Sequence, residues 1–282
     1  MALAGDGGDE LFGGYTRYRA NELFALYGRV PEAARSLLAR MLWSLPPRTK
    51  PGDVLGLAQR FVRHFEKGRG PSGQGERNGE SGFVLKRALV ASLLTPAFER
   101  AASTDPLEPY LEKYREADAE DEGDRSLYAD LLLYMPDDIL TKVDIATMAH
   151  GLEGRAPLLD HPLMEWACRL PYSEKVRLRK TKVLLKRALK PQLPRLLLER
   201  GKRGFAVPIG AWFRGPLAPL LEDALLASDA RTREILDRRE VERLVREHVA
   251  GKADWKDALW AILFLELWWR QILEGRRAVV RV

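Results

Sequence analysis

The chain opens on a segment, residues 2–18, that concentrates glycine and carboxylate side chains. Five glycines (Gly5, Gly7, Gly8, Gly13, Gly14) and three acids (Asp6, Asp9, Glu10) fall within ten consecutive residues. Because glycine lacks a Cβ and tolerates positive φ, such a backbone can come close to a ligand. Three carboxylates repel a bare phosphate, whereas Mg²⁺ is commonly held by one or two carboxylates together with substrate phosphates. The segment therefore predicts a metal–nucleotide site.

Other Gly-rich and acidic motifs do not fit this segment. The chain contains no G-x-x-x-x-G-K-[ST], and a G-x-G-x-x-G frame beginning at Gly5 places Glu10 at the third glycine. The calcium-loop pattern also fails from Asp6 onward. A purely structural alternative is a turn that leads into a helix near Asp9, where the helix dipole favours Asp9 and Glu10. Composition alone does not decide between the two interpretations.

Composition limits the class of protein. The 282 residues suffice for one large domain or two small ones with a substantial core. The single cysteine, Cys168, excludes an internal disulfide and favours a cytoplasmic protein, in which we expect it to be a buried, inert side chain. Neither a signal peptide nor an apolar run long enough to span a membrane is expected. The net charge of +6 favours anionic partners, either nucleotide phosphates or nucleic acid.

Apolar periodicity predicts a mainly helical chain. Residues 18–45 predict two helices, the second beginning at Pro31, and further helices are expected over 53–66, 85–102, 106–114, 126–134 and 255–273. The last of these is apolar nearly all round, which is typical of a helix buried in a large core. Residues 66–82 hold six glycines and few apolar side chains, so we expect a mobile surface loop there.

A second informative stretch spans residues 134–160. Pro136 suits the first turn of a helix and Gly151 suits the position after its end. Glu153 and Arg155 then alternate in an extended segment, so their side chains share a face. Such a pair forms either a structural salt bridge or part of a site.

A third stretch is strongly basic. Residues 176–203 contain eleven Lys and Arg side chains against the single acid Glu199, which is typical of helices with a solvated basic face. The stretch leads into a glycine-flanked cationic loop at 201–208. Lysine is a compact, mobile charge that suits a polyphosphate whose charge grows as a bond breaks.

These stretches resemble, in order, three signatures of the asparagine synthetase (glutamine-hydrolysing) family. Residues 4–15 resemble G-[DE]-G-x-D-E-x-F-x-G-Y. Residues 202–208 resemble the K-R-x-G-F-x-V-P-type loop, here as K-R-G-F-A-V-P. Lys182 and Lys186 resemble the K-x-L-L-[RK] helix. The middle signature, K-V-D-x-x-x-M-x-x-x-x-E-x-R-x-P-x-L-D, is matched at Lys142, Val143, Asp144, Met148, Glu153, Arg155, Pro157, Leu159 and Asp160.

The resemblance implies a fold and an activity. The expected fold is the C-terminal portion of an α/β adenine-nucleotide-hydrolase-like (ATP pyrophosphatase) synthetase domain, mainly α, with a remnant N-terminal strand. Over residues 1–282 we expect an ATP- and Mg²⁺-dependent ligase of asparagine biosynthesis. In this family ATP activates the side-chain carboxylate of aspartate as an acyl-adenylate, pyrophosphate leaves, and ammonia attacks to give the amide.

Site residues carry over position by position. Asp9 and Glu10 are the expected Mg²⁺ ligands, and Lys202 is the expected catalytic lysine at the α-phosphate. Glu153 is the expected general base toward the amine, and Asp6 is a supporting catalytic acid. The residues expected to bind the nucleotide are Gly5, Asp6, Gly7, Gly8, Lys182 and Lys202.

The sequence also departs from the family pattern. A glutaminase domain with its terminal cysteine and the S-G-G-x-D-S nucleotide loop are not found, and Ala4 replaces the usual serine. We therefore expect a truncated synthetase that does not hydrolyse glutamine, with a complementary chain as its partner and aspartate or another carboxylate as substrate. Two other classes stay open: a non-enzymatic helical partner protein, and a basic nucleic-acid-binding module.

Overall fold

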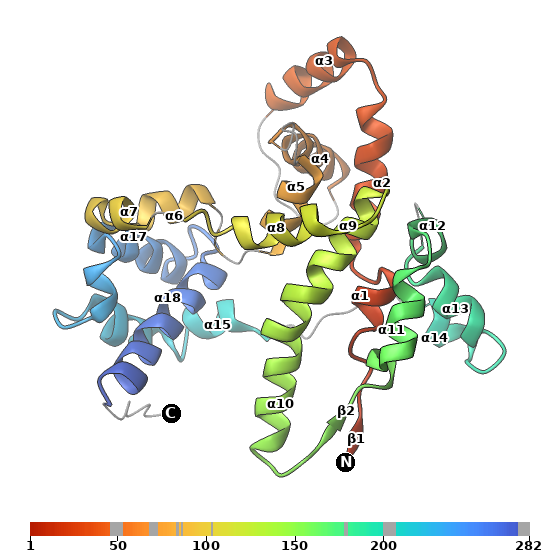
Figure 1. The fold of residues 1–282 in the computed structure, drawn as a ribbon. Helices are drawn as coiled ribbons and strands as arrows, with labels where there is room; N and C mark the ends of the chain where they lie inside the picture. The colour runs from red at the N-terminus through yellow and green to blue at the C-terminus, as the bar shows by residue number, and fades with distance from the viewer. Residues whose placement is uncertain are drawn as a thin grey trace. The chain divides into compact units, whose positions relative to one another are not determined.

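The computed structural model describes residues 1–45, 53–67, 73–82, 85, 87–102, 104–177, 180–199 and 207–275. Most of these residues are helical, and the two strands among them have two residues each, so the expectation of a mainly helical chain is confirmed. The chain separates into two compact units (Figure 1). Unit 1 comprises Met1–Ser81 and Pro106–Gly201, and unit 2 comprises Gly82–Asp105 and Lys202–Val282.

Unit 1 contains the first two sequence motifs, residues 4–15 and 142–160. Its α-helices and strands are joined by a π-helical segment, η1, and a 3₁₀ turn, η2. In chain order they are β1 (Ala2–Leu3), α1 (Gly8–Phe12), α2 (Thr16–Gly28), α3 (Glu32–Trp43), α4 (Val54–Lys67), α5 (Gly73–Gly82), α8 (Glu108–Glu116), α9 (Glu122–Ala129), η1 (Asp130–Leu140), α10 (Thr141–Met148), β2 (Gly154–Arg155), η2 (Pro157–Leu159), α11 (His161–Cys168), α12 (Tyr172–Lys175), α13 (Val183–Leu189) and α14 (Arg195–Glu199).

Local sequence signals explain several helix ends in unit 1. Pro31 precedes α3, so the division of residues 18–45 into two helices is confirmed. Asp121 precedes α9, and its Oδ1 accepts a hydrogen bond from the N–H of Gly123 at 2.6 Å, which satisfies a donor at the helix start. Gly151 follows α10 with φ of 62°, the left-handed conformation typical of a helix end.

α9, η1 and α10 form one continuous helix from Glu122 to Met148, visible as the long yellow-to-green ribbon in Figure 1. Pro136 lies inside the π-helical part of this helix, so the expectation that Pro136 begins a helix is wrong. The helix already begins after the Asp121 cap. Since proline has no N–H to donate, it interrupts a regular α-helix, and the wider π turn occurs at such irregular points.

The predicted mobile loop at 66–82 is also wrong where the structure describes it. Residues 73–82 form α5, and its glycines contact α8 closely. A Cβ on Gly79 would lie 2.4 Å from Cδ1 of Leu107, and a Cβ on Gly75 would lie 2.9 Å from Cδ1 of Tyr114. The glycines therefore serve close helix packing, which a composition-based argument for disorder does not consider. Residues 68–72 lie outside the described part.

The secondary-structure elements that unit 2 contains in its described part are all helices, with one isolated antiparallel bridge between Leu94 and Leu236. Its elements are α6 (Arg87–Leu93), α7 (Pro96–Ala101), α15 (Ile209–Phe213), α16 (Ala218–Leu221), the π-helical η3 (Glu222–Leu226), the 3₁₀ turn η4 (Arg231–Glu234), α17 (Arg238–Val249), α18 (Lys256–Trp268) and the π-helical η5 (Trp269–Leu273).

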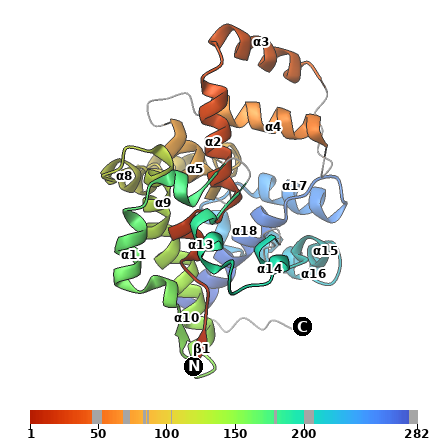
Figure 2. The same cartoon turned by 90° about the vertical axis from the view of Figure 1, so that its right-hand side faces the viewer.

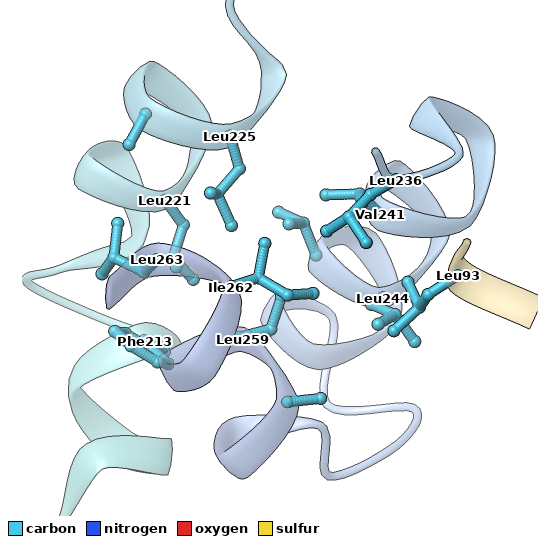
Figure 3. Packing of buried hydrophobic residues seen from close by; sticks show 13 residues of the cluster. Leu93, Phe213, Leu221, Leu225, Leu236, Val241, Leu244, Leu259, Ile262 and Leu263 are labelled. Atoms are coloured by element: carbon cyan, nitrogen blue, oxygen red, sulfur yellow. The ribbon is translucent and has the colours of Figure 1, made fainter. Parts of the chain in front are cut away.

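α18 lies at the centre of the unit 2 core. Figure 3 shows Leu259, Ile262 and Leu263 of this helix surrounded by side chains of the neighbouring helices, namely Leu93, Phe213, Leu221, Leu225, Val241 and Leu244, and by Leu236, which lies just before α17. The opposite face of α18 is exposed, with Phe264 at 55% exposure, so the expectation of burial all round is only partly correct. No helix in the described residues is long and apolar enough to cross a membrane.

Cys168 ends α11 and is exposed, contrary to the expectation of a buried cysteine. α11 buries only Ala167, and Trp166 beside it is about half exposed. The helix therefore contacts the rest of unit 1 along a narrow face, and its apolar composition overstates its burial.

Candidate functional site

The first two sequence motifs meet in a two-stranded parallel sheet. β1 pairs with β2, with Ala2 opposite Gly154 and Leu3 opposite Arg155. The N–H of Ala2 donates to the carbonyl of Glu153 at 2.8 Å, and the N–H of Ala4 donates to the carbonyl of Arg155 at 2.7 Å. The glycine-rich loop that follows β1 therefore starts beside the segment that carries Glu153 and Arg155, although the two segments are far apart in the sequence.

A cavity of about 300 Å³ lies next to this strand pair. It brings together Asp6 of the glycine-rich loop, Asp144 of α10 and Arg155 of β2. Asp144 matches the middle signature but received no role from the sequence. The other lining residues are Ala4, Leu140, Val143, Thr147, Gly154 and Ala156. The first and second motifs thus share one small, charged cavity.

Two glycines shape the backbone around α1. Gly7 has φ of 83° and Gly13 has φ of 66°, conformations that side chains other than glycine rarely adopt. A Cβ on Gly7 would lie 2.2 Å from Cδ2 of Leu159, and a Cβ on Gly13 would lie 2.2 Å from Cγ2 of Val176. These glycines therefore let α1 pack against the middle motif and α12. The structure gives Gly7 a packing role, and its contact with a nucleotide stays a prediction.

Asp9 and Lys182 form an ion pair that joins α1 to the start of α13. Nζ of Lys182 lies 2.8 Å from Oδ1 of Asp9, and both side chains are about three-quarters buried. Figure 2 shows α13 next to the red ribbon of the N-terminal segment. The predicted metal ligand and a predicted phosphate-binding lysine are therefore direct neighbours. Lys186 follows one turn later, and its pKa is lowered by burial and by the charge of Lys182.

Glu10 does not share the environment of Asp9. Its side chain is buried and accepts a hydrogen bond from the hydroxyl of Tyr15 at 2.5 Å. Burial raises the pKa of the Glu10 carboxyl, and the Tyr15 hydrogen bond opposes this effect. Glu10 lines a second cavity, of about 280 Å³, together with Asp124 and Lys175. The structure therefore does not bring the two predicted metal ligands together, and the metal role of Glu10 stays a prediction.

A buried polar network that the sequence did not indicate supports the same loop. Tyr18 donates to Asp130 of η1 at 2.5 Å, and Arg17 forms an ion pair with the same carboxylate at 2.9 Å. The guanidinium of Arg17 lies 4.6 Å from the ring centre of Tyr15. Tyr15 belongs to the first motif, whereas Asp130 lies in an apolar helical segment in which no local sequence pattern marks it.

The described residues contain no group of three His, Cys, Asp or Glu side chains that could hold a metal ion. They do offer Asp9, a partly exposed carboxylate paired with Lys182. Mg²⁺ frequently takes one or two carboxylates and completes its shell with waters and phosphate oxygens. The site therefore fits a metal ion that arrives with a polyphosphate.

Residues 1–270 match the asparagine synthase family. The chain belongs to the asparagine synthase family. A Mycobacterium tuberculosis protein provisionally named asparagine synthetase (glutamine-hydrolysing) is 32% identical over 271 residues, which cover 95% of this chain and 39% of that protein. Asparagine synthetase (glutamine-hydrolysing) 1 of Bacillus subtilis is 27% identical over 276 residues, covering 98% of this chain and 41% of that protein. The chain thus spans about two-fifths of the length of these relatives.

The remaining family positions stay predictions. Lys202 lies outside the described residues. Glu153 forms an ion pair with Arg155, with Oε1 and Nη2 2.7 Å apart, and both side chains are more than half exposed. The structural salt bridge that the sequence offered as one alternative is therefore present, and catalysis by Glu153 is untested. Gly5 is exposed, and a Cβ there would meet nothing within 4 Å.

Proposed function

We propose that this chain supplies part of the ATP-dependent, amide-forming domain of an asparagine synthetase. In the proposed reaction, an oxygen of the side-chain carboxylate of aspartate attacks the α-phosphorus of ATP, and pyrophosphate leaves. Ammonia then attacks the acyl carbon of the resulting acyl-adenylate, loses a proton, and displaces AMP to give the amide. Support comes from family membership and from the names of the relatives.

The observation that carries the proposal is the ion pair between Asp9 of α1 and Lys182 at the start of α13. Mg²⁺, when bound, neutralises the pyrophosphate oxygens and so stabilises the leaving group. Asp9 is the residue of the described part that we assign to hold it. Lys182, which directly precedes α13, and Lys186, within α13, present two ammonium groups to the same polyphosphate.

The 300 Å³ cavity suits the amino-acid substrate. Arg155 supplies a guanidinium for a carboxylate, and Asp6 and Asp144 supply carboxylates for an ammonium group. The cavity has the size of a small ligand and holds both signs of charge, as a zwitterion requires. Arg155 and Glu153 alternate on the same strand segment, so the proposed general base lies next to the proposed substrate site.

A complementary segment is the partner that we propose. In the described residues, β1 and β2 pair with each other and with no further strand, and Leu3 is 74% exposed. A two-stranded sheet is marginally stable alone, and open strand edges are templates for added strands. We infer that further strands extend this sheet into the ATP pyrophosphatase-like fold and supply the rest of the nucleotide site.

The test is aspartate- and ammonia-dependent release of pyrophosphate from Mg-ATP. It compares the 282-residue chain alone with the chain mixed with the upstream part of a relative's synthetase domain. We expect little release by the chain alone and release in the mixture, lost in Asp9→Ala and Lys202→Ala. Lys190→Ala is the matched control, because Lys190 is an exposed lysine at the end of α13. Equal release by the Asp9→Ala mixture would contradict the assigned metal ligand.

A further inference from the structure

Lys182 and Asp9 meet in a niche that two glycines keep open. A Cβ on Gly14 would lie 1.7 Å from Oδ1 of Asp9 and 2.4 Å from Cε of Lys182. A Cβ on Gly8 would lie 3.4 Å from Nζ of Lys182. Any side chain at position 14 would therefore displace one or both partners of the ion pair. The glycines therefore leave room for the ammonium group of Lys182 beside the carboxylate of Asp9.

The backbone of Lys182 is itself unusual. With φ of 53° and ψ of 42°, it is the only non-glycine residue with positive φ in the described part of the chain. Left-handed backbone at such a residue is unfavourable and persists only where the surroundings fix it. The carbonyl of Lys182 accepts a hydrogen bond from the N–H of Lys186 at 2.8 Å, which anchors the residue at the start of α13. Lys182 is therefore held at this place with its ammonium group directed to Asp9.

We propose that Lys182 and a divalent metal ion compete for the carboxylate of Asp9, so that Lys182 occupies the metal position until a metal–polyphosphate arrives. The inference rests on the proposed function, in which Asp9 is the metal ligand. An ammonium group 2.8 Å from Oδ1 repels an incoming dication and takes up one of the acceptor sites of the carboxylate. In the proposed exchange, Lys182 leaves as the metal enters, and the freed side chain meets the phosphate that enters with the metal.

The first experiment measures binding of Mn²⁺ alone to the 282-residue chain, by the paramagnetic relaxation of solvent water. The variants are Lys182→Met, Asp9→Asn and the matched control Lys190→Met, which removes an equal charge from the exposed end of α13. We expect Lys182→Met to bind Mn²⁺ about tenfold more tightly than the unsubstituted chain, because the competing charge is gone. Lys190→Met should change the affinity less than about threefold, since this charge is not paired with Asp9.

The outcomes separate this inference from the proposed function. Unchanged or weaker Mn²⁺ binding in Lys182→Met, with binding lost in Asp9→Asn, overturns the competition and leaves Asp9 as the metal ligand. Equal binding in Asp9→Asn and the unsubstituted chain overturns both. A second measurement uses Mn²⁺ with inorganic pyrophosphate: Lys182→Met should bind this complex more weakly, although it binds the metal alone more tightly. If Lys182→Met bound both Mn²⁺ alone and the Mn²⁺–pyrophosphate complex more tightly than the unsubstituted chain, the transfer of Lys182 to the phosphate would be contradicted.

Discussion

Arg17 and Asp130 form an ion pair that is largely shielded from solvent, with Nη2 of Arg17 2.9 Å from Oδ2 of Asp130. The same carboxylate oxygen accepts the hydroxyl of Tyr18, and Asp130 is only 3% exposed. The pair joins the residues just after the glycine-rich loop to the π-helical segment η1. It thereby fixes the loop against the longest helix of unit 1.

Replacing Asp130 by alanine should destabilise unit 1 strongly. The substitution leaves the guanidinium of Arg17 buried without its counter-charge, and removal of one partner of a buried pair typically costs about 3–5 kcal/mol of unfolding free energy. Urea unfolding followed by far-UV circular dichroism measures the loss. Asp105→Ala is the control, because Asp105 pairs with Arg87 at 2.7 Å on the surface, where such pairs contribute less than about 1 kcal/mol. Equal losses in the two variants would show that the Arg17–Asp130 pair is not effectively buried.

Ionisation of Glu10 should lower the free energy of unfolding as the pH rises. Burial raises the pKa of the Glu10 carboxyl above its ordinary value of 4.5. The folded chain therefore keeps this proton at pH values where the unfolded chain has lost it, and the stabilisation is present at acid pH and lost as the pH rises from about 4.5 through the folded pKa. Glu10→Gln cannot titrate, so its unfolding free energy should fall less over this interval.

The measurement for Glu10 is urea unfolding of the chain and of Glu10→Gln at several values between pH 4 and 8. Other carboxylates titrate equally in both proteins, so the difference between the two curves isolates Glu10. We expect the unfolding free energy of Glu10→Gln, relative to that of the unsubstituted chain, to increase as the pH rises. Parallel curves would mean that the carboxyl has the same pKa in the folded and unfolded chains.

Gly79→Ala should destabilise the packing of α5 on α8. The new methyl group would lie 2.4 Å from Cδ1 of the fully buried Leu107 and 2.8 Å from Cδ1 of Tyr110. Overpacking of this kind costs about 1–3 kcal/mol, more than the gain of up to about 1 kcal/mol from the higher helix propensity of alanine. Gly82→Ala in the same helix meets no described atom within 4 Å and should be neutral or slightly stabilising. Thermal unfolding of the two variants distinguishes packing from propensity, and an equal response would reject close packing at Gly79.

The helices of unit 1 show which features a sequence can predict. The division at Pro31 and the helix end at Gly151 rest on local backbone chemistry, so local residues were sufficient. α5 was missed because its glycines are explained by contact with Leu107 and Tyr110, which are distant in the sequence. Pro136 was misplaced because the helix around it begins fourteen residues earlier, at Glu122, and continues through a π-helical stretch.

In the candidate site, too, local motifs predict some features, whereas others depend on contacts between distant segments. Asp6, Asp9 and Lys182 were found because they stand in family motifs, and the structure adds that Asp9 and Lys182 are paired. Their pairing depends on Gly14, whose importance is visible only from the distances around it. Asp130 and Glu10 illustrate the opposite case. Burial determines their chemistry, and burial arises from the packing of segments that no local pattern connects.

Glu266 should be the most sensitive polar residue of unit 2. Its fully buried carboxylate accepts hydrogen bonds from the N–H groups of Arg231 and Thr232 at 3.0 and 2.7 Å and from Nε of Arg270 at 2.5 Å. Glu266→Ala leaves two backbone donors and a half-buried guanidinium without this acceptor. Since each unsatisfied buried group costs about 1–3 kcal/mol, we expect a total loss of about 3 kcal/mol or more.

Tryptophan fluorescence is the appropriate measurement for Glu266, because five of the seven tryptophans belong to unit 2: Trp212, Trp255, Trp260, Trp268 and Trp269. The urea midpoint of this signal should fall markedly in Glu266→Ala and less in Glu266→Gln, which retains one acceptor oxygen. Glu234→Ala is the matched control, since Glu234 is 59% exposed and lies 3.7 Å from Arg231. Its loss should stay below about 1 kcal/mol. If Glu266→Ala unfolds at the midpoint of Glu234→Ala, the carboxylate does not connect α18 to η4, and the apolar core around Leu259 alone holds unit 2 together.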